Sequence, residues 1–121
     1  MRKILLDTSF ILTCIRNKID LFEELFLEGY KIIIPEQVIR EIKKFEDKKT
    51  EAKLALKMLE KDFYEKIDLG SVRGNKTVDN KIIHFAKENK YTIIATLDRE
   101  IKNKIPNDIM VIRGRKKLEV I

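Results

Sequence analysis

The sequence is short of cysteine, histidine and aromatic residues, and these shortages exclude several kinds of site. The single cysteine, Cys14, cannot form an internal disulfide, and with the single histidine, His84, it cannot build a zinc knuckle or a thiol–imidazole pair. Aromatic residues make up only 7% of the chain, without the paired stacking platform of dedicated single-strand binders. Cys14 is expected to be a buried bystander, and His84 is expected to be exposed on the polar side of its helix.

Glycine and proline are also scarce, and the chain has no repeat, low-complexity tract or linker. A length of 121 residues therefore predicts one domain, 1–121. The N-terminal apolar run is too short for a signal peptide, and no stretch approaches a membrane span, so we expect a cytoplasmic protein with no membrane partner. The abundance of lysine, glutamate and isoleucine resembles the composition of thermophile proteins.

Charge and apolar residues are both plentiful. Charged residues make up 38% of the chain and hydrophobic residues 44%, which predicts a globular protein with a heavily charged surface. The formal net charge of +6 favours polyanionic partners but carries no information about the fold.

Short β-branched or aliphatic stretches alternate with amphipathic ones. This alternation predicts an α/β fold of three layers, α/β/α, with a central parallel sheet of about five strands. Two successive helical patterns, 38–45 and 50–63, have no strand between them and predict a helical hairpin arm. The expected strands are 4–6, 30–34, 64–69, 91–96 and 110–113, with 118–121 as a pairing edge; the other expected helices begin near 10, 21, 77 and 99.

Four acidic residues occupy unusual places in this pattern. Asp7 and Asp98 each follow a strand that reads as fully buried, and open α/β sheets bind ligands at that end of their strands. Asp79 and Glu41 lie at the margins of core-facing helical stripes. Taken singly, each has an ordinary structural explanation: Asp7 and Asp98 as helix caps, and Asp79 as an acid favoured by the helix dipole.

Taken together, the four acids indicate a metal site. No histidine, cysteine or lysine partner accompanies them, and carboxylates clustered alone repel one another unless cations lie between them. Oxygen ligands of this kind suit Mg²⁺ or Mn²⁺, as one or two ions. Such ions activate water for attack at phosphorus, so acids on a basic chain predict a nuclease.

Basic residues near the acids are candidates for RNA binding, although any of these groups can equally serve solubility. Arg73 and Lys76 lie in the loop before Asp79 and are placed to grip phosphates. The others assigned to this role are Lys43, Lys44 and Arg99.

Four segments in order resemble the motifs of the PIN-domain nucleases, and the resemblance runs over essentially the whole chain. The opening strand with its first aspartate, 4–9, is similar to the first motif, and 34–42, where a proline precedes a helix and its glutamate, is similar to the second. Segments 77–82 and 95–101 match the third and fourth. No single motif is specific, but four at plausible spacing are.

The resemblance implies a metal-dependent endoribonuclease in which the four acids, Asp7, Glu41, Asp79 and Asp98, ligate the metal. Hydroxyls of Thr8, Ser9 and Thr96 would orient those ligands or bound water. The sequence departs from the pattern at Asn80, where a second aspartate is often found; a carbonyl oxygen can still coordinate, but one charge needed for a second metal is lost. Leu97 likewise stands at an often polar place.

Two branches of the family compete. Segments 17–25, 50–63 and 113–117 look most like archaeal relatives of the Fcf-type nucleases, which process ribosomal RNA, so precursor ribosomal RNA is the expected substrate. The alternative is a VapC-type toxin with an antitoxin partner, and homodimers are common among relatives. A catalytically weak RNA-binding ribosome-assembly factor is a further alternative. Two other readings are disfavoured. A receiver-like domain would need a lysine after its last strand, and the segment 110–113 offers none; dinucleotide binding would need a glycine loop, and none follows the first strand.

Overall fold

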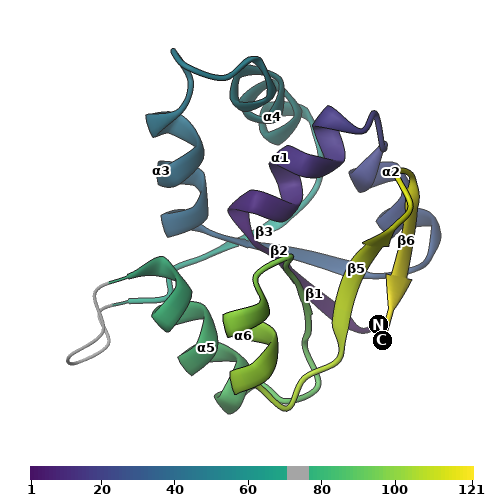
Figure 1. Cartoon of the computed structure of the whole chain (residues 1–121), viewed down its shortest axis with the longest axis vertical. Coiled ribbons are helices and arrows are strands. Elements are labelled where there is room, and N and C mark those ends of the chain that lie inside the picture. The colour runs from purple at the N-terminus through teal and green to yellow at the C-terminus, as the bar shows by residue number, and fades with distance from the viewer. Residues whose placement is uncertain (71–76) are drawn as a thin grey trace.

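The computed structural model describes residues 1–70 and 77–121 and has a six-stranded sheet between two layers of helices (Figure 1). The strand order is β3-β2-β1-β4-β5-β6. Neighbouring strands from β3 to β5 are parallel, and β6 pairs antiparallel with β5. The predicted parallel sheet and its C-terminal edge strand are confirmed. The strands are β1 Lys3–Leu6, β2 Lys31–Pro35, β3 Glu65–Ile67, β4 Ile93–Ala95, β5 Ile109–Arg113 and β6 Lys117–Val120.

The helices cover opposite faces of the sheet because the chain changes direction across it. From β1 the chain moves through β2 to β3, then returns to the other side of β1 for β4 and β5. Right-handed crossovers in the two directions place helices on opposite faces, as Figure 1 shows. On one face lie α1 Thr8–Arg16, α2 Leu21–Leu27, α3 Glu36–Lys44 and α4 Thr50–Lys61; on the other lie α5 Val78–Glu88 and α6 Arg99–Lys104. Within the described residues, no helix has the length and apolar character needed to cross a membrane.

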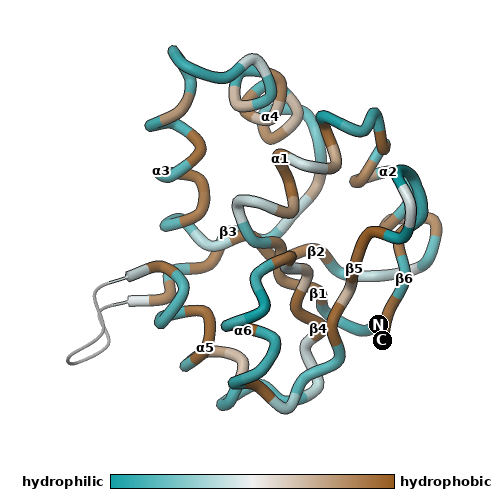
Figure 2. Tube along the Cα trace, in the orientation of Figure 1, coloured by the Kyte–Doolittle hydropathy of each residue, from teal (hydrophilic) through white to brown (hydrophobic). Residues whose placement is uncertain are grey.

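The core is centred on β1, whose three apolar residues, Ile4, Leu5 and Leu6, are fully buried. Leu5 is paired with Ile33 of β2 and with Ile94 of β4, so aliphatic side chains form a continuous layer across the sheet. Figure 2 shows this hydrophobic centre with hydrophilic residues on the outer surfaces. Burying one such side chain contributes about 2 kcal/mol, and the layer fixes the carboxyl end of β1 in place.

The predicted helical hairpin is confirmed and packs against the body of the domain. Helices α3 and α4 contact each other, and α4 also contacts α1. Two small buried side chains on α4, Ala52 and Ala55, allow this close approach. Its C-terminal half buries Leu59. The hairpin therefore brings the end of α3 and the start of α4 beside α1.

The starts of α1 and α3 agree with the sequence pattern. Asp7 is the N-cap of α1, because its side chain accepts the backbone N–H of Thr8. Pro35 ends β2 and precedes α3 with an extended backbone.

Candidate functional site

The candidate site lies at the carboxyl ends of β1 and β4, the two central strands. These strands are neighbours, yet β1 leads into α1 on one face and β4 into α6 on the other, which opens a crevice at the sheet edge. A cleft of about 420 Å³ occupies this edge. All four predicted acids line it, together with two of the predicted hydroxyl residues: Asp7, Glu41, Asp79, Asp98, Thr8 and Ser9.

Asp7 is held rigidly at the bottom of the cleft and is only 4% exposed. Its Oδ1 accepts the N–H of Thr8 at 2.7 Å, and its Oδ2 accepts the Oγ1 hydroxyl of Thr96 at 2.9 Å and the Ser9 hydroxyl at 3.4 Å. Burial raises the pKa of Asp7, and the nearby charges of Glu41 and Asp98 add to the rise, while the bonds from Thr96 and Thr8 oppose it. Asp7 therefore caps α1 and faces the other acids at the same time.

Glu41 enters the cleft from the margin of the buried stripe on α3, as the helical pattern predicts. Val38 and Ile42 on that stripe are fully buried, and Glu41 beside them is half-buried. The Thr8 hydroxyl donates to Glu41 Oε1 at 2.6 Å. This bond joins the first turn of α1 to α3 and fixes the carboxylate relative to Asp7.

Asp79 and Asp98 close the group from the other face of the sheet. Asp79 lies in the first turn of α5, as predicted, and Thr77 is the N-cap of that helix. Its pKa is raised to about 6 by desolvation first, then by the charges of Asp7 and Asp98, a side-chain hydrogen bond with Asp98, and Glu41. The four carboxylates thus interact as one electrostatic group.

Thr96 links two of these acids beneath the cleft and is fully buried. Besides donating to Asp7, its Oγ1 accepts the N–H of Asp98 at 3.1 Å. The Asp98 side chain in turn caps α6 by accepting the N–H of Glu100 at 2.8 Å. One hydroxyl therefore sets the positions of both strand-end aspartates.

The donor set fits a hard divalent cation. Among the described residues that line the cleft, the ligands on offer are carboxylate and hydroxyl oxygens, without histidine nitrogen or cysteine sulfur, which is the chemistry that Mg²⁺ and Mn²⁺ prefer. Burial is the main cause of the raised pKa values of Asp7 and Asp79, and the neighbouring carboxylates add to it; a bound cation would offset both effects. Among residues 1–70 and 77–121, however, no three acidic, histidine or cysteine side chains converge closely enough to form a metal site as they stand.

Two basic residues on the rim of the cleft were not predicted from the sequence. Arg16 at the end of α1 and Lys49 before α4 both line it. Arg16 lies 3.6 Å from Glu51, and the Lys49 ammonium lies 4.8 Å from the centre of the Phe45 ring. No motif marks either residue, because the packing of α1 against α4 brings them together.

The other predicted residues lie apart from the cleft or outside the described part of the chain. Lys43, Lys44 and Arg99 are exposed and do not line the cleft. Asn80 is half-buried in α5 beside Asp79, also outside the lining. The loop residues Arg73 and Lys76 lie outside the described residues.

The single cysteine and histidine are placed as predicted. Cys14 is fully buried, and burial raises the pKa of its thiol to about 12, so it offers no thiolate. His84 is exposed and lies 2.8 Å from Glu88 on the same helix.

Comparisons with known proteins agree with this geometry. Residues 4–117 match the family described as PIN like domain. The chain is 30% identical to Ribonuclease VapC4 of Methanocaldococcus jannaschii, over 99% of this chain and 97% of that protein. Two solved structures share the fold: that of the PIN domain endonuclease Utp24 (TM-score 0.80, 24% identity, 98% of this chain and 90% of that one) and that of VapBC2 from Rickettsia felis bound to a DNA fragment from their promoter (TM-score 0.62, 18% identity, 88% and 96%).

Proposed function

Because the chain belongs to the PIN-domain nuclease family, we propose that it is a divalent-cation-dependent endoribonuclease that hydrolyses RNA phosphodiester bonds in the cleft at the ends of β1 and β4. The observation that carries the proposal is the convergence of Asp7, Glu41, Asp79 and Asp98 on one cleft from four separate elements. The pKa values of Asp7 and Asp79 are raised by burial first and by the neighbouring carboxylates second, which suits a site that functions with a cation present.

Each residue of the cleft has a distinct task in this proposal. The four acids would hold Mg²⁺ or Mn²⁺, which activates water and stabilises charge at phosphorus when bound. Thr96 and Thr8 keep Asp7 and Glu41 in fixed positions through their hydroxyls. The attacking water gives up a proton as its oxygen adds to phosphorus, one phosphorus–oxygen ester bond breaks, and the departing ribose oxygen takes a proton.

Arg16 and Lys49 would bind the substrate backbone. A strand that approaches four carboxylates meets repulsion, and cations on the rim offset it by contacting phosphates beside the scissile one. Phosphate contacts of this kind position RNA without reading its sequence, so they support a general backbone grip.

The test is cleavage of labelled RNA by purified protein with Mn²⁺ or Mg²⁺. Asp7→Asn and Asp98→Asn should abolish cleavage while the fold survives, because asparagine still caps a helix. Asp47→Asn is the matched control, since Asp47 is exposed and lies outside the cleft. Cleavage that survives both cleft substitutions unchanged would contradict the proposal. RNA binding without cation-dependent turnover would instead indicate an RNA-binding assembly factor.

For the biological role, we propose RNA processing of the Fcf type, with precursor ribosomal RNA as substrate. The segments 17–25, 50–63 and 113–117 support it by their resemblance to that branch. The second candidate is a VapC-type toxin with an antitoxin partner, which the near full-length match to Ribonuclease VapC4 favours.

Expression in a host cell separates the two roles. A toxin should arrest growth in its wild-type form but not as Asp98→Asn, and a small antitoxin-like reading frame should lie upstream. A processing enzyme should instead leave growth unaffected and cleave precursor ribosomal RNA at defined positions.

A further inference from the structure

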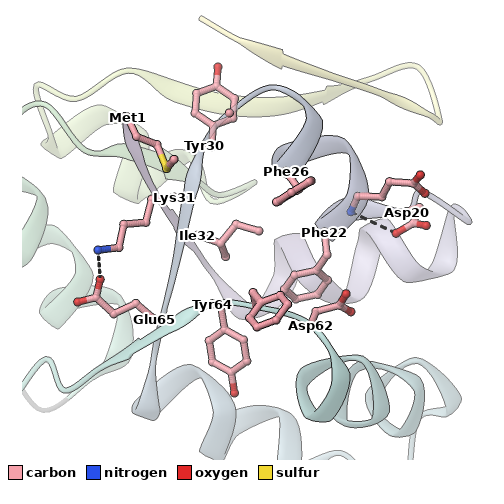
Figure 3. Close-up of a pocket in the computed structure, with 13 residues that line it drawn as sticks. Met1, Asp20, Phe22, Phe26, Tyr30, Lys31, Ile32, Asp62, Tyr64 and Glu65 are labelled. Carbon is pink, nitrogen blue, oxygen red and sulfur yellow. Dashed lines mark hydrogen bonds and ion pairs between the residues drawn. The ribbon is translucent and has the colours of Figure 1, made fainter.

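A second hollow, of about 820 Å³, lies at the amino ends of the strands, opposite the cleft that holds the acids. Ile32 of β2 forms its floor, as Figure 3 shows. Phe22 and Phe26 of α2 and Tyr64, which precedes β3, also line it (Figure 3). Phe63, between α4 and β3, is a further lining residue. We call this hollow the aromatic groove. None of its lining residues has a task in the proposed cleavage.

Large aromatic side chains at the aromatic groove are mostly exposed to solvent. The Phe26 side chain is 72% exposed and that of Phe63 is 93% exposed. Phe22, four positions before Phe26 on α2, is only 4% exposed, so the exposed apolar surface of the hollow comes mainly from Phe26 and Phe63. Scattered apolar side chains are ordinary on surfaces, but aromatics gathered on a hollow are typical of protein contacts.

The rim of the groove is acidic although the chain as a whole carries a charge of +6. Asp20, Glu23, Asp62 and Glu65 line it, and Lys31 is the only basic side chain among its lining residues. Lys31 is occupied by Glu65 at 3.0 Å. Among the described residues, the other three acids have no ion-pair partner.

From these observations we propose that the aromatic groove binds a basic amphipathic helix of a partner protein. The apolar face of such a helix would cover the aromatic residues, and its lysines or arginines would meet the unpaired acids at the rim. The adjacent edge strand β3 has only three residues, too few to bind an extended peptide by strand addition.

The charge of the rim argues against two other occupants. A second copy bound through the same face would place acid against acid across a two-fold axis. RNA would be repelled by the same carboxylates, which confines it to the basic parts of the surface. A basic helix is the occupant that satisfies both the apolar floor and the acidic rim.

The test uses a fluorescein-labelled 18-residue peptide of leucine, phenylalanine and lysine arranged as an amphipathic helix, with a matched peptide carrying glutamate for lysine. Fluorescence anisotropy should give a Kd of ~1–100 μM for the lysine peptide, weakening as salt rises, and none for the glutamate peptide. Phe26→Ser with Phe63→Ser, and separately Glu23→Lys with Asp62→Lys, should each raise the Kd at least ~tenfold.

Matched controls distinguish the groove from other surfaces. Tyr91→Ser removes an aromatic ring that is 89% exposed outside the groove, and Asp47→Lys reverses a single acidic charge elsewhere; both should leave the Kd unchanged. Asp98→Asn should also leave it unchanged, which excludes binding to the acidic cleft. RNA cleavage should be normal in the groove variants, so this proposal and the nuclease proposal fail independently.

Three results would overturn the proposal. One is binding of the lysine peptide that ignores the groove substitutions, and another is no binding at millimolar protein. The third is a dimer, by light scattering, that Phe63→Ser dissociates, which would assign the groove to a second copy of the chain.

Discussion

Replacing Thr96 by valine removes one hydroxyl while keeping the shape of a fully buried side chain. Two hydrogen bonds disappear: the one to Asp7 Oδ2 at 2.9 Å and the one from the Asp98 N–H at 3.1 Å. The Asp7 carboxylate then loses its strongest side-chain donor, and the Asp98 N–H loses its acceptor. The substitution therefore keeps both carboxylates but removes the hydrogen bonds that position them.

The cost follows from those two bonds. A hydrogen bond to a charged group contributes ~1.5–3 kcal/mol to stability. An N–H left without an acceptor lowers stability by ~1–3 kcal/mol, and by less where water can reach it. Since Asp98 is half-buried, we expect Thr96→Val to lower the free energy of unfolding by about 2–4 kcal/mol. For a domain of this size that loss corresponds to roughly 8–15 °C in Tm. Cleavage should fall ~10–100-fold because Asp7 is less well oriented.

Thr96→Ser is the matched control, because it keeps the hydroxyl and removes one methyl group, at a cost of about 1 kcal/mol. Urea unfolding and single-turnover cleavage with Mn²⁺, below the Tm of both variants, measure the two effects. The reasoning predicts that serine retains most of the cleavage rate and valine does not. Equal stability and equal rates in the two variants would refute it.

Three further predictions test other parts of the molecule. The pKa of Asp79 is raised from 3.8 to about 6, so its proton favours the folded state; that contribution is full below about pH 4 and is lost as pH rises through about 6. In EDTA, urea unfolding should therefore show Asp79→Asn gaining stability over wild type across this interval. Lys49→Ala and Arg16→Ala should raise KM for RNA ~3–10-fold with smaller effects on kcat, and should reduce the salt dependence of binding measured by filter retention. Leu5→Ala should cost about 3 kcal/mol in urea unfolding and leave cation-dependent cleavage intact at low temperature.

The acids of the site were predictable because their positions follow from local patterns. Asp7 and Asp98 come directly after strands whose burial is visible in the sequence, and parallel strands deliver their carboxyl ends to one edge. Glu41 was identifiable from helical periodicity alone, as an acid beside the Val38 and Ile42 stripe. Asp79 could be identified from two features together: its place near the start of a helix and its position beside an apolar helical stripe.

The cations and the groove were not predictable, because tertiary packing creates them. Lys49 and Arg16 lie on the same rim because α4 packs on α1. That contact depends on small side chains such as Ala52, and helical periodicity does not show which helix they pack against. The aromatic groove likewise joins α2 to the segment before β3, about forty residues later. Lys43 and Lys44, which form a conspicuous basic pair in the sequence, are exposed and lie outside the cleft lining, so their RNA-binding role stays a prediction.

The most direct test of the central claim is an anomalous-scattering map from crystals soaked in Mn²⁺. The account predicts a peak in the cleft, ligated by Asp7 and by carboxylates of at least two of Glu41, Asp79 and Asp98, and absent in the Asp7→Asn protein. Crystals of a cleavage-active preparation with Mn²⁺ bound elsewhere, or with no Mn²⁺ at these acids, would contradict it.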